Sequence, residues 1–105
     1  MEHKDQDQRS LDIHRFLAAR LQKEPHRLAD LRAQWEHWLG LPHFSCSELY
    51  SNAWLTAIDK GVDAVVRLAT DCSDFGQAVR QCSPMGVLWR SPKERWRFLR
   101  EWKRH

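Results

Sequence analysis

Apolar residues recur along this chain at the three- and four-residue intervals of an α-helix, and the strict alternation that marks a β-strand is almost absent. The cleanest stripe lies between Pro25 and Gly40. Five apolar residues there fall within about 100° of arc on a helical wheel: Leu28, Leu31, Trp35, Trp38 and Leu39. Pro25 suits a first helical turn, and Gly40 lies just past a helix end. The pattern therefore predicts a helix over residues 25–39 that faces a core.

Other segments carry the same periodicity, and capping or helix-breaking residues separate them. We expect helices over residues 11–23, from Ser45 or Ser47 to Lys60, from Val62 to Ala69, from Ser73 to Cys82, and over residues 93–104. Ser10 is the expected N-cap of the first of these. Ser91, Pro92 and Glu94 form a capping-box pattern at the start of the last.

The predicted fold is all-α, a compact single-domain bundle of five to six short helices. A chain of 105 residues is near the commonest domain size and buries enough surface for one core. We expect residues 10–105 to form this domain, with the helices over 25–39, 45–60 and 93–104 supplying most of the core. Residues 1–9 are polar, and we expect them to be mobile.

Charge is unevenly distributed along the chain. Residues 89–105 hold seven of the seventeen Lys and Arg residues, two of the fourteen acids and three of the six tryptophans. Their formal charge is therefore +5, whereas residues 1–88, with ten bases and twelve acids, carry −2. Such an asymmetry indicates a surface for an anionic partner.

The predicted helix over residues 93–104 has two distinct faces. One is apolar, with Phe98, Leu99 and Trp102. On the opposite side four cations fall within about 60° of arc: Lys93, Arg97, Arg100 and Arg104. Arg90 and Lys103 extend this basic surface. Glu94 and Glu101 can each pair with Arg97 at helical spacing and leave an ordinary solvated face. Alternatively, the row of cations binds phosphates or an acidic protein surface.

Our leading hypothesis is a small cytoplasmic, non-catalytic interaction or regulatory module that binds a protein partner, or a second copy of itself, through Trp and Arg. The residues expected to form that surface are Trp89, Arg90, Trp96, Arg97, Arg100 and Arg104. The alternative is a nucleic-acid-binding protein whose basic helix contacts phosphates. Its expected contacts are Lys93, Arg97, Arg100, Lys103 and Arg104. Residues 68–82 are also spaced as a helix-turn-helix, although Ser73 replaces its usual turn glycine and Asp74 replaces an apolar residue.

We expect no enzymatic activity, cofactor, metal site or small-molecule substrate. The glycines are isolated and form no phosphate-binding loop, and the histidines and cysteines lack the spacing of zinc ligands. A third hypothesis makes Cys46 a nucleophile near a helix N-terminus, with His43 as its base. No stretch approaches the roughly 18 apolar residues of a membrane span, and the first ten residues lack a signal peptide's apolar segment. Three cysteines without a disulfide pattern fit a reducing cytoplasm.

Overall fold

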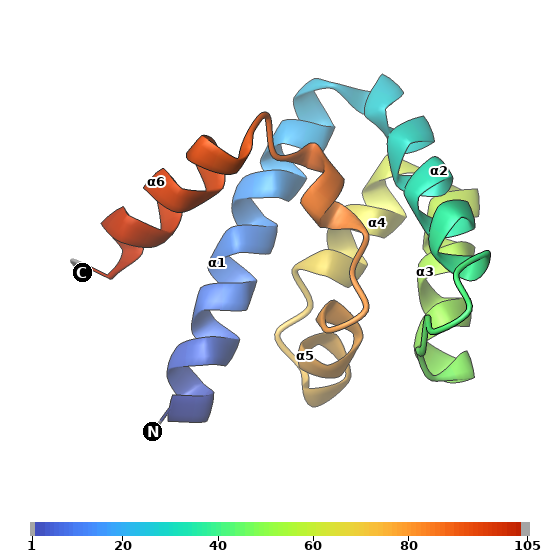
Figure 1. The fold of residues 1–105 in the computed structure, drawn as a ribbon, viewed down its shortest axis with the longest axis horizontal. Helices are drawn as coiled ribbons and strands as arrows, with labels where there is room; N and C mark the ends of the chain where they lie inside the picture. The colour runs from blue at the N-terminus through green and yellow to red at the C-terminus, as the bar shows by residue number, and fades with distance from the viewer. Residues whose placement is uncertain (1, 104–105) are drawn as a thin grey trace.

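The structure, a computed structural model, describes residues 2–103, and helices account for most of them (Figure 1). The α-helices are α1 (Glu2–Lys23), α2 (Leu28–Leu39), α3 (Glu48–Lys60), α4 (Val62–Ala69), α5 (Asp74–Arg80) and α6 (Pro92–Trp102). Two short 3₁₀ helices, η1 (Pro25–Arg27) and η2 (Met85–Leu88), join them. Within residues 2–103 there is no β-strand. The prediction of an all-α, single-domain bundle is therefore confirmed.

The first helix is longer than the sequence predicted. It begins at Glu2 rather than after Ser10, so the predicted N-cap is wrong. The added residues include Glu, Gln and Lys, which favour helices, and acids near a helix N-terminus interact favourably with its dipole. The Gln8 amide also donates to the Asp12 carboxylate one turn later, at 3.0 Å. The mobility expected of residues 1–9 stays a prediction, and Met1 lies outside the described residues.

The core lies where α1, α2, α3 and α4 meet, and η2 packs against α1 and α2. Trp35 and Trp54 are its largest fully buried side chains. The Trp54 indole N–H donates to the Val79 carbonyl at 2.8 Å, so burial of this ring leaves its polar atom paired. The remaining fully buried side chains include Leu17, Leu21, Leu31, Ile58, Val65, Met85 and Leu88. The core therefore draws on α1, α4 and η2 as well as on α2 and α3.

The sequence predicted that the last helix supplies much of the core, and this is wrong. No residue of α6 is buried, and its apolar residues Phe98, Leu99 and Trp102 are only half-buried. Figure 1 shows α6 beside α1, on the side away from α2 and α3. A stripe of three apolar residues, with charged residues on both sides, is wide enough to pack on one helix but too narrow to enter the core.

Two glycines are required by the backbone. Gly61 joins α3 to α4 at φ 120°, a conformation that residues with a Cβ rarely adopt. Gly76, in the first turn of α5, approaches the segment after α4 so closely that a Cβ would overlap the Asp71 carbonyl.

The buried Arg80 guanidinium donates to the carbonyls of Ala69 and Asp71, at 3.3 and 2.6 Å. These contacts fix α5 against the C-terminal end of α4.

His14 is a buried titratable group in α1. Its side chain is 7% exposed, and Nδ1 donates to the Ser10 carbonyl at 2.7 Å. Nε2 has no hydrogen-bond partner within residues 2–103. Burial, with a smaller contribution from the nearby Arg80 cation, lowers the pKa of His14 from 6.5 to about 4. The imidazole is therefore neutral in the folded protein at neutral pH.

The free energy of unfolding should decrease as the pH falls from 6.5 to about 4. In this range the unfolded chain binds a proton at His14 that the folded chain does not, because the pKa of His14 is lowered on folding. The full loss is roughly 3 kcal/mol. Urea unfolding across this pH range measures it, and His14→Gln should flatten the dependence. The exposed His26→Gln serves as the control. An unchanged slope in His14→Gln would contradict the assignment.

Candidate functional site

An ion pair between Arg20 and Glu94 joins α6 to α1. The two guanidinium Nη atoms donate to the two carboxylate oxygens at 2.6 and 2.7 Å, and Nη1 also donates to the Leu88 carbonyl at 3.0 Å. The side chains are only 9% and 21% exposed. The Arg20 guanidinium, together with the Arg90 backbone N–H at 2.8 Å, lowers the pKa of Glu94 to about 2. The carboxylate is thus ionised, and the first turn of α6 is fixed on α1.

Three aromatic rings pack beside this ion pair. Phe16 on α1 lies 5.6 Å from Trp89 and 5.2 Å from Phe98, and Trp89 and Phe98 are 5.7 Å apart, all between ring centroids. The Arg20 guanidinium lies 5.0 Å from the centre of the Phe16 ring. The cluster holds the segment before α6 and the middle of α6 against the same part of α1.

The far end of α6 is held by Trp102. Its indole N–H donates to the Asp12 carboxylate at 2.8 Å. α6 is therefore attached at its first turn by Glu94, at its middle by Phe98 and at its last turn by Trp102. Because α6 is fixed at three points, its opposite side has one orientation before a partner binds. Binding therefore costs less conformational entropy.

That opposite side, which we call the outer face of α6, is basic and contains one large aromatic residue. Its members are all exposed: Lys93, Trp96, Arg97, Arg100 and Lys103. Trp96 is 61% exposed, and the Arg95 guanidinium lies 5.8 Å from its ring centre. Among residues 5–103, whose side chains the structure describes, none of the four cations forms an ion pair. Neither pairing expected for an ordinary solvated face, Glu94 with Arg97 or Arg97 with Glu101, occurs among residues 5–103. Glu94 binds Arg20 instead.

A hollow of about 390 Å³ lies at the margin of this face, between α6 and the N-terminal half of α1. Trp96 and Leu99 supply its apolar lining, and Arg9, Arg100 and Lys103 supply three cations. No acid lines it. The hollow therefore combines an exposed indole with positive charge from two helices.

The structure brings most of the predicted interface residues together, but in different roles. Trp96, Arg97 and Arg100 share the outer face with Lys93 and Lys103. Trp89 is instead half-buried in the aromatic cluster. Arg90 is exposed and its guanidinium lies 3.9 Å from the Glu24 carboxylate. Arg104 lies outside the described residues.

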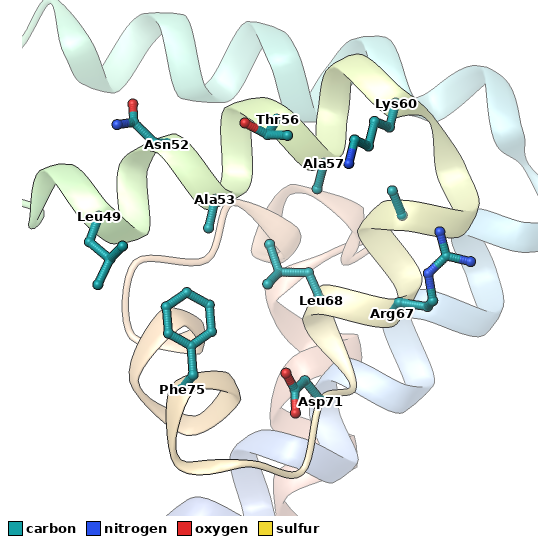
Figure 2. A pocket seen from close by; sticks show the side chains of 11 residues that line it. Leu49, Asn52, Ala53, Thr56, Ala57, Lys60, Arg67, Leu68, Asp71 and Phe75 are labelled. Atoms are coloured by element: carbon teal, nitrogen blue, oxygen red, sulfur yellow. The ribbon is translucent and has the colours of Figure 1, made fainter.

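Sequence reasoning missed the residues of α1 that position α6. Arg20 follows Phe16 by one helical turn, so an arginine next to an apolar stripe was visible in the sequence. Nothing local identified its partner, because Glu94 lies 74 positions away. Arg9 was missed because the helix was expected to begin after it. A groove between α3 and α4, about 520 Å³ in volume, was also not predicted (Figure 2).

The cysteine hypothesis loses its physical basis. Burial and the neighbouring Cys82 thiol raise the pKa of the Cys46 thiol to about 12, opposite to what a nucleophile needs. His43 is exposed in the connector before α3. Within residues 2–103, no three His, Cys, Asp or Glu side chains are grouped so that they could hold a metal ion.

Comparisons with protein-family models, with curated proteins and with solved structures found no match to this chain. In the described part of the chain, no helix combines the length and the apolar character needed to cross a membrane.

Replacing Glu94 should loosen the attachment of α6 to α1, because only the contacts of Phe98 and Trp102 then hold it. Glu94→Gln leaves the nearly buried Arg20 cation unpaired, so the free energy of unfolding should fall by about 2–3 kcal/mol. Amide hydrogen exchange should become faster throughout α6. Because folding lowers the pKa of Glu94 from 4.5 to about 2, its contribution is complete above pH 4.5 and is lost as the pH falls towards 2.

Glu101→Gln is the matched control, since Glu101 lies on the same helix and is exposed. Equal protection of the α6 amides in Glu94→Gln and Glu101→Gln would mean that the ion pair does not hold the helix.

Proposed function

We propose that this chain is a small, cytoplasmic, non-catalytic interaction module that binds a protein partner, or a second copy of itself, through the outer face of α6. The observation that carries the proposal is the 61% exposure of Trp96 among cations that form no ion pair with residues 5–103, whose side chains the structure describes. Trp and Arg are the residues most enriched where binding energy is concentrated in protein interfaces.

The attachment of α6 supports the same proposal. The ion pair with Arg20, the aromatic cluster and the Trp102 hydrogen bond hold the helix before any partner arrives. Trp96 contributes to none of these attachments. Its removal should therefore leave the fold intact and affect the binding of a partner alone.

The chemistry of the face defines the partner. Lys93, Arg97 and Arg100 require acidic groups, and the indole of Trp96 requires an apolar contact among them. The partner surface is therefore acidic with an apolar centre. Charged contacts at the edge of an interface mainly raise the association rate, and they weaken as the salt concentration rises. An indole that the partner covers contributes most of the binding free energy.

Site-specific photo-crosslinking in cells tests this function. A crosslinking amino acid at position 97, on the outer face, should form protein adducts, and Trp96→Ala should reduce them by about tenfold or more. Position 29 on α2 is an exposed control. Adducts between two copies of the chain would identify self-association. Equal adducts from both positions, or adducts unaffected by Trp96→Ala, would refute the proposal.

The hollow beside Trp96 favours a second candidate, binding of single-stranded nucleic acid. A base stacks on an exposed aromatic ring, and cations follow the phosphates. Trp96 supplies the ring and Arg9, Arg100 and Lys103 supply the charges. α5, by contrast, offers no exposed cation, because Arg80 is buried, so a helix-turn-helix mode of duplex binding has little support.

Fluorescence anisotropy with labelled single-stranded and duplex DNA tests this candidate. With three phosphates neutralised, the logarithm of affinity for single strands should fall with the logarithm of salt at a slope of about −2. Trp96→Ala should remove the preference for single strands, and Arg100→Glu should weaken binding to both. No binding at about 50 mM salt excludes nucleic acid as the partner.

A further inference from the structure

The groove between α3 and α4 is a consequence of small residues on the sides of both helices that face it. Ala53 and Ala57 on α3 and Ala64 on α4 form part of its lining, and their methyl groups leave a volume of about 520 Å³ (Figure 2). Gly61 is the one residue between the two helices, and α3 and α4 pack against each other. The groove lies outside the outer face of α6 and shares no residue with it.

One end of the groove is apolar and unusually exposed. Figure 2 shows Leu49 and Phe75 together at this end, with Leu68 pointing into the middle. Leu49 is 62% exposed and Phe75 is 37% exposed. Phe75 is kept at the edge by an edge-on contact with Tyr50, at 5.7 Å between ring centroids. Large apolar side chains gathered in an open hollow mark a surface that another molecule covers.

The other end is basic. Lys60 and Arg67 lie there, on α3 and α4 (Figure 2), and neither forms an ion pair within residues 2–103. Asp71 also lines the groove, and a hydrogen bond from the Ser73 backbone N–H at 2.8 Å lowers the pKa of its carboxyl and keeps it ionised. Its negative charge offsets one of the two cations, so the charged residues of the lining carry a net charge of +1. The occupant therefore needs an apolar portion at Leu49 and acidic groups at Lys60.

The shape of the groove favours a helix. From Leu49 to Lys60 it extends about 16 Å along α3, the length of roughly three helical turns. It is open along this length, whereas sites for small molecules enclose most of the ligand. Alanines in the lining allow a third helix to approach to about 8–10 Å, the usual distance between packed helices.

We propose that this groove docks an amphipathic, acidic helix of a partner protein, which places apolar residues on Leu49, Leu68 and Phe75 and carboxylates on Lys60 and Arg67. In this kind of binding, apolar residues at positions i, i+3, i+4 and i+7 of the bound helix contact the groove. The charge of the groove's basic end selects among such helices. The interaction is separate from that of α6, so the chain has two binding surfaces of different chemistry.

Selection from a displayed library of peptides about 16 residues long tests the proposal with the full chain as bait. Selected peptides should carry an apolar stripe with Glu or Asp beside one end of it. Leu49→Glu should weaken their binding by about tenfold or more, measured by fluorescence polarisation. Lys60→Glu should weaken the binding of the acidic peptides. It should leave unchanged the binding of the same peptides with Gln in place of Glu.

Leu39→Glu is the matched control, because Leu39 is a 53% exposed leucine on α2 outside the groove. Circular dichroism and thermal melting establish that all variants fold. Peptides that bind the Leu49→Glu variant as tightly as the unaltered chain would overturn the proposal. Peptides whose binding is lost in Trp96→Ala rather than in Leu49→Glu would also overturn it, and they would support the function proposed for α6. Self-association that Leu49→Glu abolishes, seen by light scattering, would assign the groove to a second copy and overturn it as well.

Discussion

The guanidinium of Arg20 connects parts of the chain that lie far apart in the sequence. It donates to the Leu88 carbonyl at the end of η2 and to both carboxylate oxygens of Glu94 in the first turn of α6. Because its donors form a rigid, planar fork, satisfying both oxygens sets the direction of α6 as well as its distance from α1. Trp89 and Phe98 then meet Phe16, and the basic surface takes its place on the outside. Arg20 therefore fixes the first turn of α6, and Phe98 and Trp102 hold the rest of the helix in the same orientation.

Local patterns in the sequence predicted the helices well because local contacts define them. The capping residue Ser91 accepts a hydrogen bond from the Glu94 N–H, as the capping-box pattern indicated, and Ser73 accepts one from Gly76 at the start of α5. The start of α1 was placed too late. Ser10 resembles an N-cap, but the polar residues before it continue the helix, and no apolar pattern in the sequence marks them as helical.

The candidate site was predicted in its composition but not in its geometry. The cations and Trp96 on one side of α6 follow from helical spacing alone. The placement of α6 on α1 does not, since Arg20 and Glu94 are 74 positions apart and Glu94 already had a local role in the capping pattern. The groove between α3 and α4 was hidden for a different reason. Ala53, Ala57 and Ala64 suit any helix, and only the pairing of the two helices turns them into a hollow.

The stability of the fold explains only part of the charge on α6, since Arg100 lies in the last turn, where the helix dipole favours a cation. Lys93 and Arg97, and Arg97 and Arg100, are helical neighbours of like charge, and each such pair costs about 0.2–0.5 kcal/mol. Lys93 also lies in the first turn, where the helix dipole disfavours a cation. Of the two acids that could offset them, Glu94 is bound to Arg20, and Glu101 forms no ion pair among residues 5–103. Packing accounts for Glu94, Phe98 and Trp102, but it requires neither the row of cations nor the exposed Trp96. A partner that brings carboxylates to the row and covers the indole would account for both.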